Sequence, residues 1–514
     1  MKPDLRFFQH RLLRLVVLAC FSSTSVYSNI AFAQAQKLPT LGDTARGDLS
    51  PVMERRLGEQ IMTEVRHDPD FIDDGPVNEY LNKLGNSLLD KRPDARGEDA
   101  YEFEFFAVRD PVLNAFAFPG GFIGFHSGLI LAAQSESELA SVMGHEIGHV
   151  SQRHVARMLG NQKQDALIPL AALLLAVLAA KSSPDAAMAV AMGGQSLSLQ
   201  RQLSFSRDAE READRIGFQI LKDGGYDPGG MLAFFGRLQY STRNYSDNAP
   251  SYLRSHPVTS ERMADIQGRL FNERFKQRTD GLDFYLTQAR IRVLQDSKAQ
   301  GLADAIIFFE NQVKNGNEEA RLSAQYGLAF VAFKKADFNT AELKLNELMQ
   351  RVSQLAHQKK WLHETSAFVS LAIDIEMGKK HPDLALKKAK EAMSEFPLAR
   401  GLIHQYAEVL IEAKLPEQAE IFLRDQISLY RHEAKLQHLL AKAYAVDNKK
   451  ALQHMALAEA YALEGALPAA LQQLDLARLD PDVKYFDLSV IDAREREWKE
   501  KHREELAGEK KTGK

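Results

Sequence analysis

Two histidines four residues apart, His145 and His149, lie in a segment whose pattern predicts a helix. Ser135, followed three residues later by Glu138, forms a capping box, and apolar residues then recur at helical spacing to about Leu159. Residues four apart project from one face of a helix at adjacent turns. The two imidazoles can therefore bind one zinc ion, each through a nitrogen about 2.0–2.1 Å from the metal.

Glu146 directly follows the first histidine of the pair. Zinc lowers the pKa of a bound water to about 7, and a neighbouring carboxylate can take the proton of that water as it attacks a carbonyl. The same five-residue pattern also arises by chance, and a histidine pair on a helix surface would look identical. The capping box, the apolar flanks and the small residues Gly144 and Gly148 favour a zinc site.

A catalytic zinc site needs a third protein ligand and one open coordination position. The residues after His149 do not supply a third histidine at the Gly-x-x-His spacing, and the chain has only one cysteine, Cys20. The third ligand is therefore expected to be a carboxylate from another helix. A second helix is predicted at about 200–223, and its segment 206–214 contains four acidic residues.

The first 33 residues have the pattern of a cleavable signal peptide. Basic residues precede an apolar stretch at 15–26, and Ala31-Phe32-Ala33 fits the small-x-small cleavage pattern. A membrane anchor and lipidation at Cys20 are the alternatives, although the apolar core is shorter than the ~20 residues that span a bilayer. Cleavage after Ala33 would leave no cysteine, and residues 34–49 would form a linker.

The following residues predict an α+β domain that is mostly α. Helical spacing is found between Leu57 and Leu89, residues 101–105 alternate as in a strand, and a Pro-Gly-Gly turn at 119–121 precedes a second strand at 122–125. Residues 166–180 are almost entirely apolar but too few to span a membrane comfortably. They predict a buried helix or a lid, with peripheral contact to lipid or an unfolded client as the alternative.

The C-terminal third is helical throughout and contains a degenerate repeat. Four alanines recur in similar contexts at spacings of 44, 34 and 51 residues, and the middle spacing equals the tetratricopeptide period. The last spacing corresponds to that period plus one extra helix. Each alanine is paired with an upstream small or apolar residue where two helices would cross; the pairs are Ala329 with Ala341, Ile373 with Ala385, Ala407 with Ala419 and Ala458 with Ala470. A generic array of helical hairpins is the alternative.

Four ordered motifs within residues 50–270 resemble peptidase family M48. The family's pattern is matched by His145 to His149, by Ser-Arg-x-x-Glu-x-x-Ala-Asp at 206–214, by Asn-Ala-x-x-x-Pro-Gly-Gly at 114–121, and by Ser255-His256-Pro257 with Arg262. A signal peptide combined with C-terminal tetratricopeptide-like repeats is similar to a periplasmic subgroup of this family.

The resemblance implies the roles of individual residues. Glu210 is implied as the third zinc ligand, and Asp214, one turn later, as a carboxylate that orients a ligand histidine. Glu212 competes as a ligand, but two positions from Glu210 it points to another side of the helix. Asn114 is implied to bind substrate, because its segment resembles an edge strand that holds an extended peptide beside the metal.

His256 has three possible roles. It can be a loop histidine with a structural hydrogen bond, it can stabilise the oxyanion of the tetrahedral intermediate, or it can fill the open fourth position of the metal and keep the enzyme closed. Loss of activity on replacement would support oxyanion stabilisation, and gain of activity would support the plug.

The sequence thus predicts a gluzincin-like metallopeptidase domain at 50–275, a helical linker at 276–315, a tetratricopeptide-like repeat domain at 316–485 and a charged helical tail at 486–514. One Zn²⁺ per chain is expected, with Glu146 as general base. The resemblance implies an endopeptidase of the periplasm, with association to the outer membrane as an option. It implies that the enzyme cleaves misfolded or stalled envelope proteins and contacts outer-membrane assembly machinery through its repeats. A chaperone or adaptor with suppressed proteolysis is the alternative. The formal net charge of −4 gives no case for nucleic-acid binding.

Overall fold

The computed structural model describes residues 50–97, 101–160, 206–243, 251–271, 278–357 and 365–512, together with 273, 359 and 362. The predicted signal peptide, Cys20, the linker 34–49 and the apolar segment 166–180 lie outside the described residues. Within the described residues, no helix is both long enough and apolar enough to cross a bilayer.

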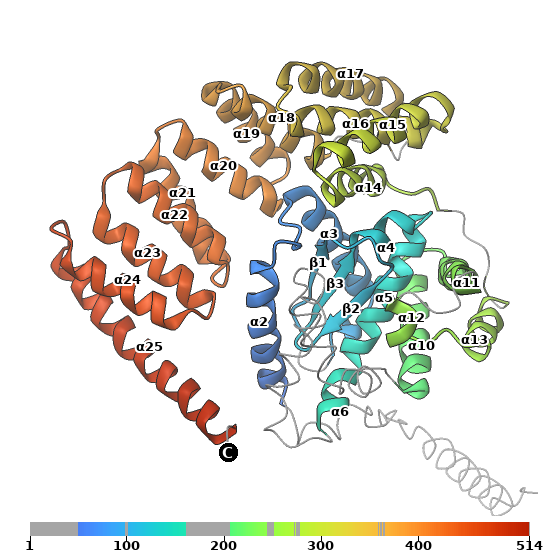
Figure 1. Cartoon of the computed structure of the whole chain (residues 1–514), viewed down its shortest axis with the longest axis horizontal. Coiled ribbons are helices and arrows are strands. Elements are labelled where there is room, and N and C mark those ends of the chain that lie inside the picture. Colours follow the sequence, from blue (N-terminus) through green and yellow to red (C-terminus); the bar gives the residue numbers. More distant parts are fainter. Residues whose placement is uncertain are drawn as a thin grey trace, which may run out of the picture. The chain divides into compact units, whose positions relative to one another are not determined.

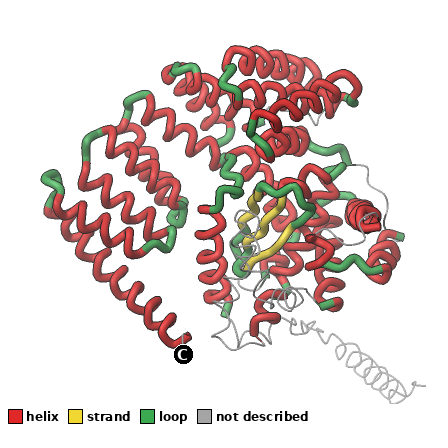
Figure 2. The backbone as a smooth tube through the Cα atoms, viewed as in Figure 1, coloured by secondary structure: helices red, strands yellow, loops and turns green. Residues whose placement is uncertain are grey.

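A three-stranded sheet forms the β part of the fold (Figure 2). The strands are β1 (Glu104–Val108), β2 (Ala115–Phe118) and β3 (Phe122–His126), in the order β1-β3-β2. β3 is central, parallel to β1 and antiparallel to β2, with Phe106 opposite Gly124 in the first pair. The first strand was expected at 101–105, but the ladder begins three residues later, because Glu104 is the first residue whose partner on β3 is in register.

The sheet is covered on both faces by helices (Figure 1). Phe105, Ile123 and Phe125 belong to the large core that includes α3 (Gly75–Lys91) and α5 (Glu136–Ser151). Phe106, Phe118 and Phe122 pack on the other side against α2 (Pro51–His67). Successive side chains of a strand point to opposite faces, which explains why Phe105 and Phe106 enter different cores.

The helix α5 carries the histidine pair and begins where the capping box predicts. The Ser135 hydroxyl accepts from the Glu138 amide at 3.3 Å, whereas the Glu138 carboxylate accepts from the amide of Gln134. The helix does not continue to Leu159. It ends at Ser151, Arg153 takes a left-handed conformation with φ 52°, and the shorter helix α6 (His154–Gly160) follows.

The helix α10 (Arg207–Asp223) crosses α5 at close range, and Ser206 caps its N-terminus. A Cβ added at Gly217 would lie 2.9 Å from the backbone nitrogen of His145. A Cβ at Gly148 would lie 3.0 Å from Cα of Ala213. Small residues on both helices therefore allow the two backbones to approach, and this contact fixes where the acidic residues of α10 lie relative to the histidines.

Shorter helices complete this part of the chain. They are η2 (Pro93–Arg96), α4 (Ser127–Ala132), α11 (Gly229–Arg243), α12 (Ser251–Ser255) and α13 (Ser260–Leu270). Thr259 caps α13 through the amide of Arg262. The α12–α13 connection carries His256 and Pro257, and it thereby brings the last of the sequence motifs toward α5 and α10.

All regular elements described after Leu282 are helices. They are α14 (Leu282–Gln295), α15 (Ala299–Asn315), α16 (Glu318–Lys334), α17 (Phe338–Ala356), α18 (Ser366–Gly378), α19 (Pro382–Glu395), α20 (Arg400–Glu412), α21 (Pro416–Leu429), α22 (Ala434–Val446), α23 (Lys450–Leu463), α24 (Leu467–Leu479) and α25 (Tyr485–Thr512). The first of them, expected to be part of a linker, is firmly packed: Arg290 is buried against Asp74, the N-cap of α3, at 2.6 Å.

The repeated alanines of the sequence lie on successive helix pairs. The pairs are α16 with α17, α18 with α19, α20 with α21 and α23 with α24, and all eight pattern residues are at most 1% exposed. The helix α22 stands between the last two pairs, which accounts for the longest spacing. The charged tail is helical, and its Ile491 and Trp498 are buried against α23 and α24.

We predict that replacing Gly217 with Ala destabilises the protein although alanine is the better helix former. The new methyl group would meet the α5 backbone, and such overpacking costs about 1–3 kcal/mol. Gly268→Ala on α13 is the matched control, because nothing lies within 4 Å of its added Cβ, and this change should stabilise by about 0.5–1 kcal/mol. Urea unfolding measures both, and a shift in the same direction for the two variants would contradict the close crossing.

Candidate metal centre

Four side chains from three helical segments converge in the interior. His145 and His149 come from α5, Glu210 from α10 and His256 from the end of α12, and one ligand atom from each lies within 4.8 Å of the others. Nε2 of His149 lies 3.0 Å from Nε2 of His145 and 3.4 Å from Oε1 of Glu210. All four residues are buried. Two imidazoles and a carboxylate are the donor set of a catalytic zinc site, so the residues present fit such an ion.

His145 is oriented by a carboxylate on its other side. Its Nδ1 lies 3.0 Å from Oδ1 of Asp214, and Arg262 in turn holds Asp214 through two bonds of 2.6 and 2.7 Å. Burial alone would lower the pKa of His145, but the hydrogen bonds and charges of Asp214 and Glu210 outweigh it and raise that pKa to about 9. Asp214 thus lies beside the first histidine of the pair, on the side of the ring that faces away from the cluster.

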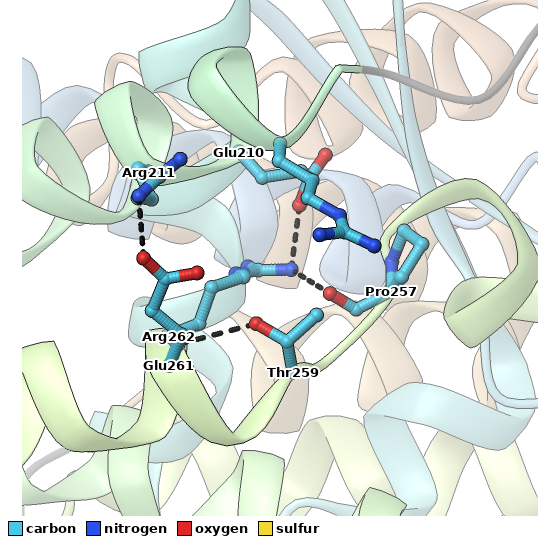
Figure 3. Close-up of a pocket in the computed structure, with 7 residues that line it drawn as sticks. Glu210, Arg211, Pro257, Thr259, Glu261 and Arg262 are labelled. Carbon is cyan, nitrogen blue, oxygen red and sulfur yellow. Dashed lines mark hydrogen bonds and ion pairs between the residues drawn. The ribbon is translucent and has the colours of Figure 1, made fainter.

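Arg262 also contacts Glu210, the carboxylate of the cluster. Its Nη1 lies 2.7 Å from Oε2 of Glu210 and donates to the Pro257 carbonyl at 2.8 Å. These residues line a small pocket beside the centre, where Figure 3 shows the guanidinium between Glu210 and Pro257. Burial would raise the pKa of Glu210, but His256 and the ligand histidines hold it well below its usual value. Glu210 is thus a carboxylate in the folded protein.

His149 is supported by residues that sequence reasoning missed. Its Nδ1 lies 2.8 Å from Nδ1 of His154, whose Nε2 lies 3.1 Å from Oε2 of Glu212. Glu212 also accepts from Arg157 at 2.9 Å. Burial lowers the pKa of His154 to about 4, against the opposing effect of Glu212. Glu212 therefore points away from the ligand cluster, as its position two residues from Glu210 predicts.

Glu146 is positioned as a free acceptor. It is fully buried, and neither of its carboxylate oxygens makes a hydrogen bond within the described residues. Nε2 of His256 lies 3.7 Å from Oε1 of Glu146. Burial raises the pKa of Glu146, against the opposing charges of His256 and His145. A carboxylate with unoccupied oxygens and a raised pKa is suited to take up a proton.

His256 lies in the cluster rather than in a solvent-exposed loop. Its Nδ1 is 2.9 Å from Oε1 of Glu210 and 3.4 Å from Nε2 of His145. The ring stacks on Tyr252 with centroids 4.7 Å apart, and it is 2% exposed. The contact with Glu210 is compatible with a structural hydrogen bond as well as with a role at the metal.

Asn114 precedes the outer strand β2, and its side chain faces a different group. Its Nδ2 lies 3.5 Å from Nε2 of His126, and Nδ1 of that ring is 3.2 Å from Asp110. Oδ1 of Asn114 is buried and has no hydrogen-bond partner within the described residues. The neighbouring Leu113 carbonyl accepts from the amide of Tyr252, which ties this segment to the helix that leads to His256.

The chain belongs to peptidase family M48, whose model matches residues 77–270. It is a metalloendopeptidase, and the matched segment contains every residue of the cluster described above. Among known proteins it is 31% identical over 468 residues to the beta-barrel assembly-enhancing protease of Escherichia coli strain K12. The aligned region covers 90% of this chain and 92% of that relative.

Two further relatives differ in how much of the chain they share. A putative beta-barrel assembly-enhancing protease of Vibrio cholerae is 35% identical over 348 residues, covering 67% of this chain and 69% of its own length. The mitochondrial metalloendopeptidase OMA1 of Arabidopsis thaliana is 28% identical over 243 residues, covering 47% of this chain and 46% of its own length.

We predict that metal affinity rises with pH up to about 9. A metal must displace the proton that His145 carries below its raised pKa, so affinity should fall about tenfold for each pH unit below 9. Competition with a chromophoric chelator at pH 6.5, 7.5 and 8.5 measures this. Asp214→Asn removes one carboxylate that raises the pKa of His145, so metal affinity should depend less steeply on pH in this variant. Equal metal affinity of the wild type at all three pH values would show that protonation of His145 does not compete with the metal.

Proposed function

We propose that this protein is a zinc-dependent endopeptidase whose metal is held by His145, His149 and Glu210. The observation that carries the proposal is the buried cluster of these three ligand groups with Glu146 beside it, its two oxygens unpaired within the described residues. Zinc, when bound there, activates a water molecule and polarises the carbonyl of the scissile bond.

The side chains of the centre then have separate tasks. Glu146 accepts the proton of the attacking water and passes it to the amine that leaves, because its raised pKa lets it hold that proton between the two steps. Asp214 fixes the ring of His145 through Nδ1 and leaves Nε2 free for the metal. Arg262 balances part of the negative charge of Asp214 and Glu210.

His256 supplies the fourth protein group of the resting centre. Its Nδ1 lies among the ligand atoms of the cluster, where it competes with water and substrate for the open position. The stabilisation of an oxyanion is the other role open to it, and it would require the ring to turn toward substrate. The contact of Nδ1 with Glu210 at 2.9 Å favours the arrangement in which His256 fills the fourth position of the metal.

The substrates we propose are misassembled envelope proteins of a bacterial periplasm. The relatives named for β-barrel assembly align with nine tenths of this chain, including its C-terminal helices. The pattern of the N-terminal 33 residues supports export and cleavage, with association to the outer membrane as a further step. An extended substrate would lie along the outer strand β2, with Asn114 as a side-chain contact and backbone hydrogen bonds as the main recognition.

The helix pairs of residues 316–485 would form a tetratricopeptide-like domain that binds clients or assembly machinery. Large apolar side chains stand exposed on this region, among them Leu398 at 81% and Ile421 at 72%. The same observation favours the second candidate function, a chaperone or adaptor in which proteolysis is suppressed. The two functions differ in whether Glu146 is needed.

We predict that Glu146→Gln abolishes cleavage of casein while zinc content stays near one per chain. The substitution removes the base and leaves the three ligands, so activity should fall by roughly 10²–10⁴-fold or more. Zinc is measured by mass spectrometry on the purified protein. Full rescue of cellular phenotypes by this variant would favour the adaptor function, and absence of zinc from the wild type would contradict the proposed centre.

We predict that His256→Ala increases casein cleavage, because it removes the group that fills the fourth position. The gain should appear in kcat with zinc content unchanged, since His145, His149 and Glu210 remain. A loss of activity would instead assign oxyanion stabilisation to His256, and an unchanged rate would contradict both roles.

A further inference from the structure

We propose that His154 and Glu212 are positioning residues that select the metal-binding tautomer of His149, an inference that rests on the zinc centre proposed above. The two nitrogens of the His149 ring face opposite directions. Nε2 faces the cluster, 3.0 Å from His145, and Nδ1 faces His154 at 2.8 Å. A histidine binds metal only through a nitrogen that carries no proton, so the location of the proton on this ring decides whether it is a ligand.

Hydrogen bonding along this series of groups allows one consistent assignment of protons. Two ring nitrogens 2.8 Å apart need one donor and one acceptor. If Nδ1 of His149 donates, Nδ1 of His154 accepts, and the proton of the neutral His154 ring is on Nε2, where it donates to Glu212 at 3.1 Å. Nε2 of His149 is then bare and faces the metal position.

The opposite assignment is disfavoured by Glu212. If His154 donated to His149, its own Nε2 would be an unprotonated acceptor facing a carboxylate, and the proton of His149 would point into the ligand cluster. A ring nitrogen and a carboxylate oxygen that both accept cannot form a hydrogen bond, so the contact between them at 3.1 Å would no longer be stabilising. Glu212 is held in place by Arg157, which belongs to the same helix as His154 and donates to the Glu212 carboxylate at 2.9 Å. The carboxylate therefore determines the tautomer of a ligand that it does not touch.

The break between α5 and α6 makes this contact possible. In a continuous helix of 3.6 residues per turn, a residue five positions after His149 would be rotated by about 140° and would face away. The left-handed turn at Arg153, with φ 52°, reverses the chain so that His154 lies over Nδ1 of His149. Arg153 is itself anchored to Glu54 of α2 at 2.8 Å. The side chain of His154 is 1% exposed, so solvent does not compete for its nitrogens.

The two ligand histidines are thus oriented by different means. Nδ1 of His145 lies directly beside Asp214, at 3.0 Å from Oδ1, which is the usual pairing of a metal-bound histidine with a carboxylate. His149 reaches its carboxylate, Glu212, through the ring of His154. Replacement of residues that orient a metal ligand typically costs 10–100-fold in metal affinity, which sets the scale of the effect to expect.

The test compares zinc affinity, by chelator competition, among variants of the full chain. His154→Leu removes both hydrogen bonds and should weaken zinc binding 10–100-fold. His154→Asn retains an oxygen near the position of Nδ1 that can accept from His149, and affinity should return to within about threefold of the wild type. His404→Leu is the control, because His404 is also mostly buried and paired with a glutamate, Glu433, but belongs to α20.

A double-mutant cycle separates positioning from packing. Glu212→Leu should weaken zinc binding, because Glu212 acts on His149 through His154. The double variant Glu212→Leu with His154→Leu should bind zinc no more weakly than His154→Leu alone, since both residues act through one series of hydrogen bonds. Visible absorption of the Co²⁺-loaded proteins gives a second readout, with band positions of the two leucine variants shifted and those of His404→Leu unchanged. Glu212→Leu is informative even if His154→Leu fails to fold.

Three outcomes overturn the inference. Wild-type affinity in His154→Leu, or equal loss in the leucine and asparagine variants, would show that the His154 hydrogen bonds do not matter. Strictly additive losses in the cycle would show that Glu212 acts independently of His154. A wild-type protein that binds no zinc would contradict the proposed centre itself, and this result is distinguished from the others because it appears before any variant is compared.

Discussion

The close crossing of α5 and α10 is the contact on which the rest of the centre depends. Gly144, Gly148 and Gly217 let two helix backbones meet where any side chain would separate them. Only at this distance can Glu210 reach the face of α5 that carries the histidine pair, since a glutamate side chain has a fixed length. The sheet and the helices around it hold this crossing in place, because α5 is buried along nearly its whole length and packs in the same core as the strands.

Local patterns predicted the parts of the centre that depend on one helix at a time. The capping box located the start of α5, the four-residue spacing placed both histidines on one face, and the divergence of Glu212 from Glu210 followed from helix geometry. The family motif assigned Glu210 and Asp214, which the acidic segment alone left open. The alanine spacing predicted the helix pairs and the extra helix α22, because small residues mark close helix crossings in sequence as they do in space.

Features that depend on the irregular backbone were not predictable in this way. A helical pattern continues through 152–160, so the sequence gives no sign that Arg153 turns left-handed and that His154 returns over His149. Arginine in this conformation has no strong propensity signal, and its stabilising partner, Glu54, is 99 residues earlier. The start of β1 was missed for a related reason: alternation begins at Tyr101, but only pairing with β3 decides where the ladder starts.

The charges around the cluster explain why a divalent cation suits it. Glu146, Glu210 and Asp214 are buried carboxylates, and the guanidinium of Arg262, which is also buried, contacts Glu210 and Asp214. With the histidines neutral and Glu146 ionised, two negative charges remain in a region where isolated charge is costly.

Without metal, the raised pKa of His145 lets a proton offset one of these two negative charges. A doubly charged ion offsets both, and it leaves His145 free of that proton. The arrangement that makes the metal-free protein retain a proton is therefore the same one that makes a divalent ion the better occupant. Glu212 and Arg157, which balance each other, add no charge to this sum, so they can orient His149 without altering the preference for the ion.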